Sequence, residues 1–202
     1  MKNCDEYWDI ETAFLRGRDA LVVIKTGAGG TVHGYQDKYK KLAEYIHQRT
    51  GYAVLTVDNP LGADKEENFD VTMTAVEFAN DVTEAVGGGD VPVYYIGFSM
   101  GASLGAMYGW QYPYIRKMLL INPPLMINWH RQRAGLEQFS GEKAVVAVGS
   151  SDPSYKFAGL IDCIDNPCIE KTILYDTGHS LSVDMNAIIF DMLFAGQGQY
   201  AM

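Results

Sequence analysis

The chain has 202 residues, of which 48% are hydrophobic and 20% are charged. These proportions are ordinary for a globular protein, and they exclude an intrinsically disordered chain. Because the formal net charge is −9, no basic surface is available for phosphate groups, and we expect neither nucleic acid nor an anionic membrane as a partner. The length suits one domain over residues 1–202, with a core over about 7–195 and a frayed tail over 196–202.

The amino terminus and the cysteines bear on cellular location. Residues 1–6 are polar and lack the apolar core of a secretory signal, and no apolar run approaches membrane-spanning length. The three cysteines, Cys4, Cys163 and Cys168, have no metal-type spacing. We therefore expect a cytoplasmic protein with free thiols and no metal site, with a pairing of Cys163 and Cys168 left to their geometry.

Strands and helices are predicted to alternate, which is typical of a mostly parallel sheet covered by helices on both faces. A segment near Tyr7–Leu15 is expected to supply an edge strand or hairpin, and Leu21–Ile24 a strand buried on both sides. The glycine-rich loop Thr26–Gly30 follows that strand. The other predicted strands are 52–57, 93–96, 117–121, 144–148 and 169–175, and the predicted helices are 35–49, 71–86, 102–112, 127–139, 155–164 and 183–194.

The pentapeptide Gly97-Phe98-Ser99-Met100-Gly101 lies between a predicted strand and a predicted helix. A G-x-S-x-G sequence in that context indicates a nucleophile elbow, a sharp turn that exposes a strained serine at the top of the sheet. The residues two before and two after the serine nearly touch, which glycine permits. Gly105 and Gly109 continue the glycine spacing along the helix and predict close packing against the sheet.

A serine nucleophile needs a base, and histidine is the usual one because its pKa lies near operating pH. Of the four histidines, His179 follows an apolar strand, in the kind of loop where open α/β sheets place their chemistry. His47 and His130 fall within predicted helices, where solvated or packing roles are expected. His33 follows the glycine loop and is a candidate for lining a pocket.

The group that orients the base is also expected at the carboxyl end of a strand. Asp152 follows the predicted strand 144–148 and is preferred. Asp58 ends a strand that precedes the elbow, and Asp176 stands only three residues before the histidine. Asn122 ends another strand but is neutral, so it could not stabilise an imidazolium as a carboxylate does.

An oxyanion hole requires two backbone N–H groups directed at the developing negative charge. The first is expected from Met100, directly after the nucleophile. The second is expected from the glycine-rich loop, with Ala28 preferred and Gly29 as the near alternative. This loop matches neither phosphate-binding glycine motif, so no nucleotide or other cofactor is expected.

These features together resemble the α/β-hydrolase superfamily over about residues 7–195. The resemblance rests on the strand–GFSMG–helix sequence, the later Gly-Ser-Ser-Asp ending at Asp152, and a late Gly178-His179, in the order Ser…Asp…His. It implies an α/β-hydrolase fold in which Ser99 is the nucleophile, His179 the base and then the acid, and Asp152 the orienting carboxylate. Many members begin the oxyanion loop with His-Gly, whereas this chain has Thr26-Gly27.

The stretch between Asn122 and Lys143 has room for one helix but not for the cap domain that many relatives carry. The resemblance therefore implies a shallow, open pocket. Its candidate walls are Gly29, Tyr35, Met100, Met126, Trp129 and Phe157, although each large side chain could equally be ordinary core.

The expected function is a serine hydrolase that cleaves a small ester or thioester through an acyl-enzyme intermediate, with a small acyl compound as its binding partner. Two alternatives remain open: a peptidase or amidase on the same three residues, and a non-catalytic ligand-binding protein of the same fold. The choice of chemistry rests on analogy, since this scaffold supports unrelated reactions.

Overall fold

The computed structural model describes residues 10–87, 91–181 and 185–194. Strands and helices alternate along these residues as the sequence predicts. The strands are β1 (Thr12–Leu15), β2 (Leu21–Lys25), β3 (Ala53–Val57), β4 (Val93–Phe98), β5 (Ile115–Ile121), β6 (Lys143–Gly149) and β7 (Ile169–Leu174). The α-helices are α1 (Lys38–Thr50), α2 (Lys65–Gly87), α3 (Met100–Tyr108), α4 (Trp129–Gln138) and α5 (Asn186–Phe194), and the 3-10 helices are η1 (Tyr35–Asp37), η2 (Gly109–Gln111) and η3 (Tyr155–Cys163).

The seven described strands form one sheet in the order β1-β3-β2-β4-β5-β6-β7. The edge strand β1 is antiparallel to β3, and every other neighbouring pair is parallel. The chain fills the sheet outward from β2 toward β3 and then, from β4, in the opposite direction. The carboxyl ends of β2 and β4 therefore flank the point of reversal, where open α/β sheets bind their ligands.

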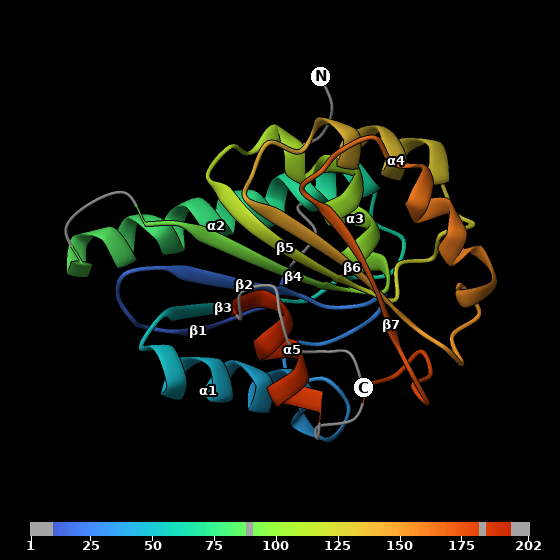
Figure 1. The fold of residues 1–202 in the computed structure, drawn as a ribbon. Helices are drawn as coiled ribbons and strands as arrows, with labels where there is room; N and C mark the ends of the chain where they lie inside the picture. Colours follow the sequence, from blue (N-terminus) through green and yellow to red (C-terminus); the bar gives the residue numbers. More distant parts are fainter. Residues whose placement is uncertain (1–9, 88–90, 182–184, 195–202) are drawn as a thin grey trace.

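Helices cover both faces of the sheet (Figure 1). α1 and α5 bury Leu42, Ile46, Ile189 and Leu193 against one face. α2, α3 and α4 cover the other, where the core includes Phe69. The central strands β2 and β3 are buried along their whole length, because each is covered on both faces. The expected α/β-hydrolase architecture is confirmed in this respect.

Helix starts differ from the predicted ones, and local contacts or backbone angles explain the differences for α2 and α1. α2 begins at Lys65 rather than near Val71, because Asp64 Oδ1 accepts hydrogen bonds from the N–H groups of Glu66 and Glu67 at 3.0 and 3.1 Å and so caps the helix. α1 begins at Lys38. The residue before it, Asp37, has φ of 58°, so the predicted single helix starts as a short 3-10 turn.

The connection from β5 to β6 contains the single helix α4. A compact ten-residue helix in this place is consistent with the prediction that no cap domain is present. Several predicted features lie outside the described residues: residues 7–9 of the predicted edge segment, residues 183 and 184 of the last predicted helix, the tail 196–202, and Cys4. Cys163 and Cys168 are free thiols.

Candidate active site

Ser99 occupies the turn between β4 and α3, with φ of 50° and ψ of −112°. A non-glycine residue in this region of backbone space is strained and persists only when its surroundings hold it there. The Ser99 N–H donates to the Ile121 carbonyl at 2.8 Å, and its own carbonyl accepts from the Ser103 N–H at 3.0 Å. The turn thus holds the serine hydroxyl at the carboxyl end of the sheet.

The glycines on either side of the serine are required by close backbone contacts. A Cβ at Gly97 would lie 2.6 Å from the Gly101 carbonyl oxygen, and a Cβ at Gly101 would lie 2.5 Å from the Lys25 carbonyl oxygen. Real Cβ atoms are not found at such distances from backbone. Farther along α3, a Cβ at Gly105 would lie 2.5 Å from the Tyr95 ring, so the predicted close packing of this helix on the sheet is confirmed.

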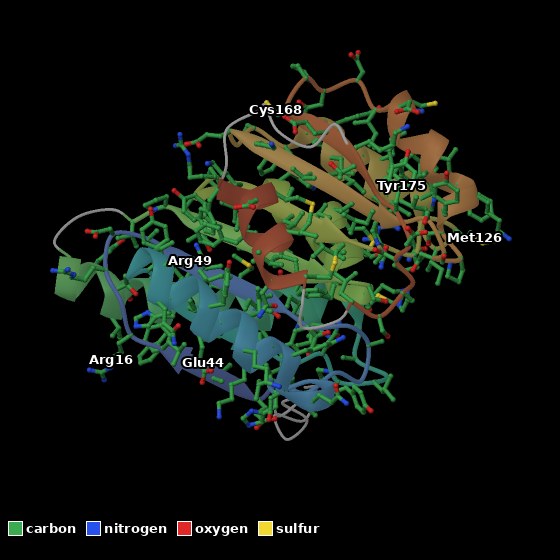
Figure 2. All side chains as sticks on the ribbon, turned by 60° about the horizontal axis from the view of Figure 1, so that its bottom comes forward. Arg16, Glu44, Arg49, Met126, Cys168 and Tyr175 are labelled. Carbon is green, nitrogen blue, oxygen red and sulfur yellow. The ribbon has the colours of Figure 1, made fainter. Side chains whose placement is uncertain are left out.

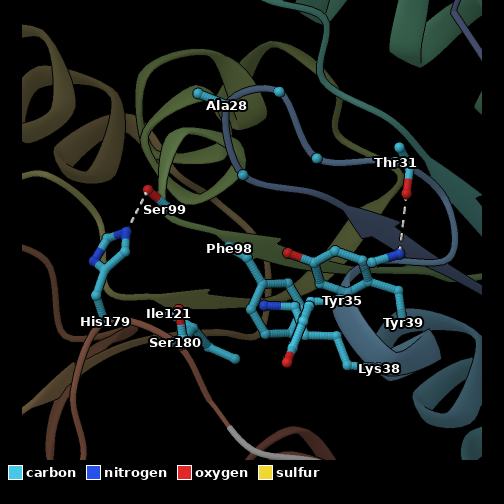
Figure 3. Close-up of a pocket in the computed structure, with 14 residues that line it drawn as sticks. Ala28, Thr31, Tyr35, Lys38, Tyr39, Phe98, Ser99, Ile121, His179 and Ser180 are labelled. Atoms are coloured by element: carbon cyan, nitrogen blue, oxygen red, sulfur yellow. Dashed lines mark hydrogen bonds between the residues drawn. The ribbon is translucent and has the colours of Figure 1, made fainter.

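Three side chains from separate strand ends form a continuous hydrogen-bonded chain. His179 Nε2 lies 3.0 Å from Ser99 Oγ, and His179 Nδ1 lies 2.5 Å from Asp152 Oδ2. The serine follows β4, the aspartate follows β6 and the histidine follows β7. Figure 3 shows the contact between the histidine ring and the serine at the edge of a pocket.

The Asp152 carboxylate is buried, with 1% of its side chain exposed. Its second oxygen, Oδ1, accepts a hydrogen bond from the Ser154 N–H at 2.6 Å. A buried carboxylate held at both oxygens is suited to orient an imidazole and to stabilise its charged form. The other candidate acids lie elsewhere: Asp58 interacts with Lys25, and the Asp176 N–H is bonded to Ser150.

The remaining histidines are outside this chain of hydrogen bonds. His47 Nδ1 lies 2.8 Å from the Tyr52 carbonyl oxygen, which agrees with the packing role predicted for it. His33 Nδ1 lies 3.9 Å from an Asp37 carboxylate oxygen on the surface. His130 belongs to α4.

Asn122 is a structural element of the site that the sequence analysis considered only as a substitute for the acid. Its side chain is buried, and its Nδ2 donates to the carbonyls of Gly178 and His179 at 3.0 and 3.1 Å. Its Oδ1 accepts from the Gly149 N–H at 2.7 Å. One amide therefore joins the end of β6, which leads to Asp152, to the loop that carries the histidine. The sequence did contain a signal for this role, because Asn122 is a polar residue directly after a strand that is buried at its carboxyl end.

The hydrogen bonds of the backbone N–H groups near Ser99 bear on the expected oxyanion donors. The Met100 N–H belongs to the first turn of α3, where it has no partner within the helix. In the glycine-rich loop, the Gly29 N–H donates to the Asn59 carbonyl at 2.7 Å and the Gly30 N–H donates to the Gly27 carbonyl at 2.8 Å. Within the described part of the chain, the Ala28 N–H has no backbone partner. This difference favours Ala28 over Gly29 as the second donor.

A buried polar network contacts the glycine-rich loop Thr26–Gly30. Lys25 Nζ donates to the Asp58 carbonyl at 2.5 Å and to Asn68 Oδ1 at 2.7 Å. The Asn68 amide donates to Asn59 Oδ1 at 2.8 Å, and the Asn59 amide donates to the Thr26 carbonyl at 3.1 Å. The network reaches the carbonyl of Thr26, the residue that stands where many members of the resembled family have a histidine.

Burial lowers the pKa of Lys25 to about 7, and the nearby Asp58 carboxylate opposes this shift. Desolvation penalises the charged ammonium, while both of its hydrogen bonds remain available to a neutral amine. Burial also raises the pKa of Asp58, against the attraction of Lys25. The support of the oxyanion loop therefore contains a lysine whose charge is only weakly favoured at neutral pH.

A pocket of about 480 Å³ opens beside Ser99 and His179 (Figure 3). Of the predicted wall residues, Gly29 and Tyr35 line it. The full lining is Gly27, Ala28, Gly29, Gly30, Thr31, Gly34, Tyr35, Lys38, Tyr39, Phe98, Ser99, Ile121, His179 and Ser180.

The other predicted wall residues are not part of this lining. Met126 is 65% exposed and projects outward near the carboxyl ends of the strands, as does Tyr175 (Figure 2). Trp129 and Phe157 pack against the core on the face covered by α2, α3 and α4. Their positions differ from the expectation because the pocket opens toward η1 and the start of α1, a direction that sequence order does not reveal.

No group of three or more His, Cys, Asp or Glu side chains among the residues that the structure describes has the arrangement to hold a metal ion. No described helix combines the length and the apolar character needed to cross a bilayer.

No protein-family model and no curated protein sequence matches this chain. Solved structures do match it. Est1E from Butyrivibrio proteoclasticus is 11% identical, with 91% of this chain and 92% of that chain covered and a TM-score of 0.73. An alpha-beta serine hydrolase homologue from Coxiella burnetii is 12% identical, with 91% of each chain covered and a TM-score of 0.70.

The esterase domain of a Rhodothermus marinus protein is 12% identical, with 92% of this chain and 96% of that chain covered and a TM-score of 0.65. The match in each case spans nearly the whole of both chains, which extends the likeness beyond the elbow to the complete sheet and its helices. The chain has the α/β-hydrolase fold.

Proposed function

We propose that this protein is a serine hydrolase that cleaves a small ester or thioester through an acyl-enzyme intermediate on Ser99. The observation that carries the proposal is the hydrogen-bonded chain from Ser99 through His179 to the buried Asp152. A serine hydroxyl is a weak nucleophile until a positioned base accepts its proton, and this arrangement supplies the base and the group that orients it.

In the first half of the reaction, Ser99 Oγ forms a bond to the substrate carbonyl carbon as its proton passes to His179 Nε2. The carbonyl π electrons move to the oxygen, and the N–H groups of Met100 and Ala28 are assigned to bind that oxyanion. When the C=O bond re-forms, the bond to the leaving oxygen or sulfur breaks, and the leaving group takes the proton from His179.

In the second half, His179 removes a proton from water as the water oxygen attacks the acyl carbon. Collapse of the second oxyanion breaks the bond to Ser99 Oγ, which recovers its proton, and the free acid leaves. Asp152 holds the imidazole orientation and stabilises its charged form in both halves.

An ester or thioester is preferred over an amide for two reasons. The pocket is open, with the wall residue Tyr35 80% exposed, which suits small and accessible substrates. Several proteins of like fold are named esterases, and Est1E has also been solved with ferulic acid bound. A peptidase or amidase on the same three residues is the second candidate.

The proposal is tested by labelling the folded protein with a fluorophosphonate probe, which modifies activated serines. The wild type should be labelled, whereas Ser99→Ala and His179→Ala should lose the label. Ser180→Ala is the matched control, because this serine lines the same pocket outside the hydrogen-bonded chain, and it should be labelled like the wild type. A folded wild type that resists the probe and cleaves no ester, thioester or amide overturns the proposal and favours a ligand-binding protein.

A further inference from the structure

The pocket beside Ser99 has a charge unlike that of the protein around it. The chain as a whole has a formal net charge of −9. Among the described residues that line the pocket, Lys38 carries the one permanent charge and none is a carboxylate. An acidic protein thus has a positive side chain in the pocket that contains its proposed nucleophile. A neutral or cationic substrate would not require this positive charge.

Lys38 is the first residue of α1, and its side chain lies in the pocket beside Tyr35 and Phe98 (Figure 3). Its Nζ lies 4.8 Å from the centroid of the Tyr39 ring. The Tyr39 ring in turn packs against Phe98, with centroids 5.0 Å apart, and Phe98 directly precedes Ser99. A series of contacts therefore runs from the Lys38 ammonium through two packed aromatic rings to the residue before Ser99.

Among the described residues, the ammonium of Lys38 has no carboxylate partner. Within the described residues, the ion pairs of the other lysines and of the arginines lie elsewhere, and none involves Lys38. Lys38 is partly buried, and desolvation lowers its pKa. A cation that is partly desolvated and unpaired is stabilised when a bound anion supplies the missing charge.

Nearby lysines do not share this environment. Lys40 and Lys41 are exposed and outside the pocket lining, and Lys41 Nζ donates to the Gln36 carbonyl at 2.9 Å. Polar groups that can donate a second hydrogen bond to an anion, the Tyr35 and Ser180 hydroxyls, line the same pocket as Lys38. One cation with neutral donors matches a carboxylate better than a doubly charged phosphate.

We propose that the pocket selects esters that carry a carboxylate, and that Lys38 binds this carboxylate and determines the specificity of the enzyme. The inference rests on the proposed hydrolase function and names the substrate class of that same site. The carboxylate can belong to the acyl part or to the alcohol part of the ester, and the two are separated by the choice of substrates.

The test compares two substrate pairs. For the acyl side, monomethyl glutarate is compared with its uncharged isostere, in which a methyl ketone replaces the carboxylate. For the alcohol side, the acetate ester of γ-hydroxybutyrate is compared with the corresponding methyl ketone. Hydrolysis is followed by proton NMR. We expect the wild type to have at least a tenfold higher kcat/KM for the charged member of one pair, and that pair identifies the side.

Variants of Lys38 test whether this residue causes the preference for the charged ester. Lys38→Met should lower kcat/KM for the preferred charged ester by about 10- to 100-fold, the size expected for a charge-assisted hydrogen bond, and should leave the uncharged isosteres within about twofold. Lys38→Arg should restore much of the preference. Lys41→Met, one turn farther along α1 and outside the pocket, is the matched control and should behave like the wild type.

The outcomes distinguish this inference from the function on which it rests. Hydrolysis of charged and uncharged esters at equal rates, or an equal loss for both in Lys38→Met, overturns the inference and leaves the hydrolase intact. If the wild type hydrolyses neither pair, the carboxylate site is judged by NMR titration of Ser99→Ala with monomethyl glutarate and the γ-hydroxybutyrate ester. Binding of either that is lost with Lys38→Met supports the site, and its absence overturns it.

Discussion

The two sides of Ser99 are held by different kinds of buried polar contact. On the side of His179 and Asp152, the Asn122 side chain bonds to backbone groups at the end of β6, which leads to Asp152, and in the loop that carries His179. On the side of the oxyanion loop, Asn59 is part of a network that ends at the buried amine of Lys25. Both asparagines follow strands at the same edge of the sheet.

Because their buried contacts differ, the two sides of Ser99 should respond differently to pH. A neutral amide that bonds to backbone groups keeps its contacts at any pH at which the protein is folded. The network behind the oxyanion loop contains a lysine whose pKa is lowered to about 7, so its charge changes near neutrality. The support on the side of His179 and Asp152 thus contains no titrating group, whereas the support on the side of the Thr26–Gly30 loop contains Lys25.

The largest effect is expected at the acid itself. Asp152→Asn keeps the shape of the side chain but removes the charge that stabilises the imidazolium, and it should lower kcat by roughly 10³- to 10⁴-fold, as in other enzymes with this arrangement. Asp176→Asn is the matched control, because this residue is exposed, and its kcat should stay near that of the wild type. Near-normal turnover in Asp152→Asn contradicts the assignment. Steady-state kinetics on a neutral ester checks both variants.

An intermediate effect is expected at the two asparagines. Asn122→Ala leaves the Gly149 N–H and two carbonyls without their partner, which should cost about 2–4 kcal/mol of unfolding free energy. Because the histidine loop loses its support, kcat should fall by roughly 10²-fold with KM little changed.

Asn59→Ala provides the comparison on the other side, since it also removes buried amide contacts. It should lower stability by a similar amount, but fluorophosphonate labelling of Ser99 should slow less than in Asn122→Ala, because the base remains in place. Denaturant unfolding and labelling rates measure the two quantities. Equal labelling rates in Asn59→Ala and Asn122→Ala would contradict the expected difference between the two sides of Ser99.

The smallest effect is a pH dependence of stability. At pH values between about 7 and 10, Lys25 is deprotonated when folded and protonated when unfolded. The unfolded state then binds more protons, so the unfolding free energy rises with pH through this window, by at most about 1.4 kcal/mol per pH unit from this residue. Below pH 7 both states are charged, and this contribution to the slope disappears.

Lys25→Met should flatten the rise, and the exposed Lys41→Met should retain it. Urea unfolding at several pH values across the window measures the slope. Tyrosines with raised pKa values, among them Tyr112 at about 12, act in the opposite direction at higher pH, because their folded forms retain protons that the unfolded chain releases. An unchanged slope in Lys25→Met would show that the buried amine does not titrate there.

Much of the fold followed from local pattern. Apolar runs such as Leu21–Ile24 predicted strands buried on both faces, and helical spacing in α1 predicted the buried stripe of Leu42 and Ile46. Helix starts were less predictable, because they depend on caps. The start of α2 at Lys65 depends on hydrogen bonds from Asp64, and a polar stretch before a helix can equally be a loop.

The candidate site, like the fold, could be predicted only in part. Ser99, His179 and Asp152 were predicted because their residue types follow strands that end at one edge of the sheet, and the structure brings the three together. The pocket walls were not predictable, since Met126, Trp129 and Phe157 are near the site in chain order yet lie outside the lining. Lys38, at the start of α1, lines the pocket together with Ser99, a placement that no local pattern encodes.

The sequence by itself determined the order of strands and helices, the strained elbow at Ser99 and the residues that were expected at the site, because hydrophobic periodicity and glycine requirements act over a few residues. Only the tertiary structure decided which N–H group in the glycine loop stays free, which amide holds the histidine loop, and which cation faces the pocket. Those properties depend on hydrogen bonds and packing between residues far apart in the chain, which form only when the sheet assembles.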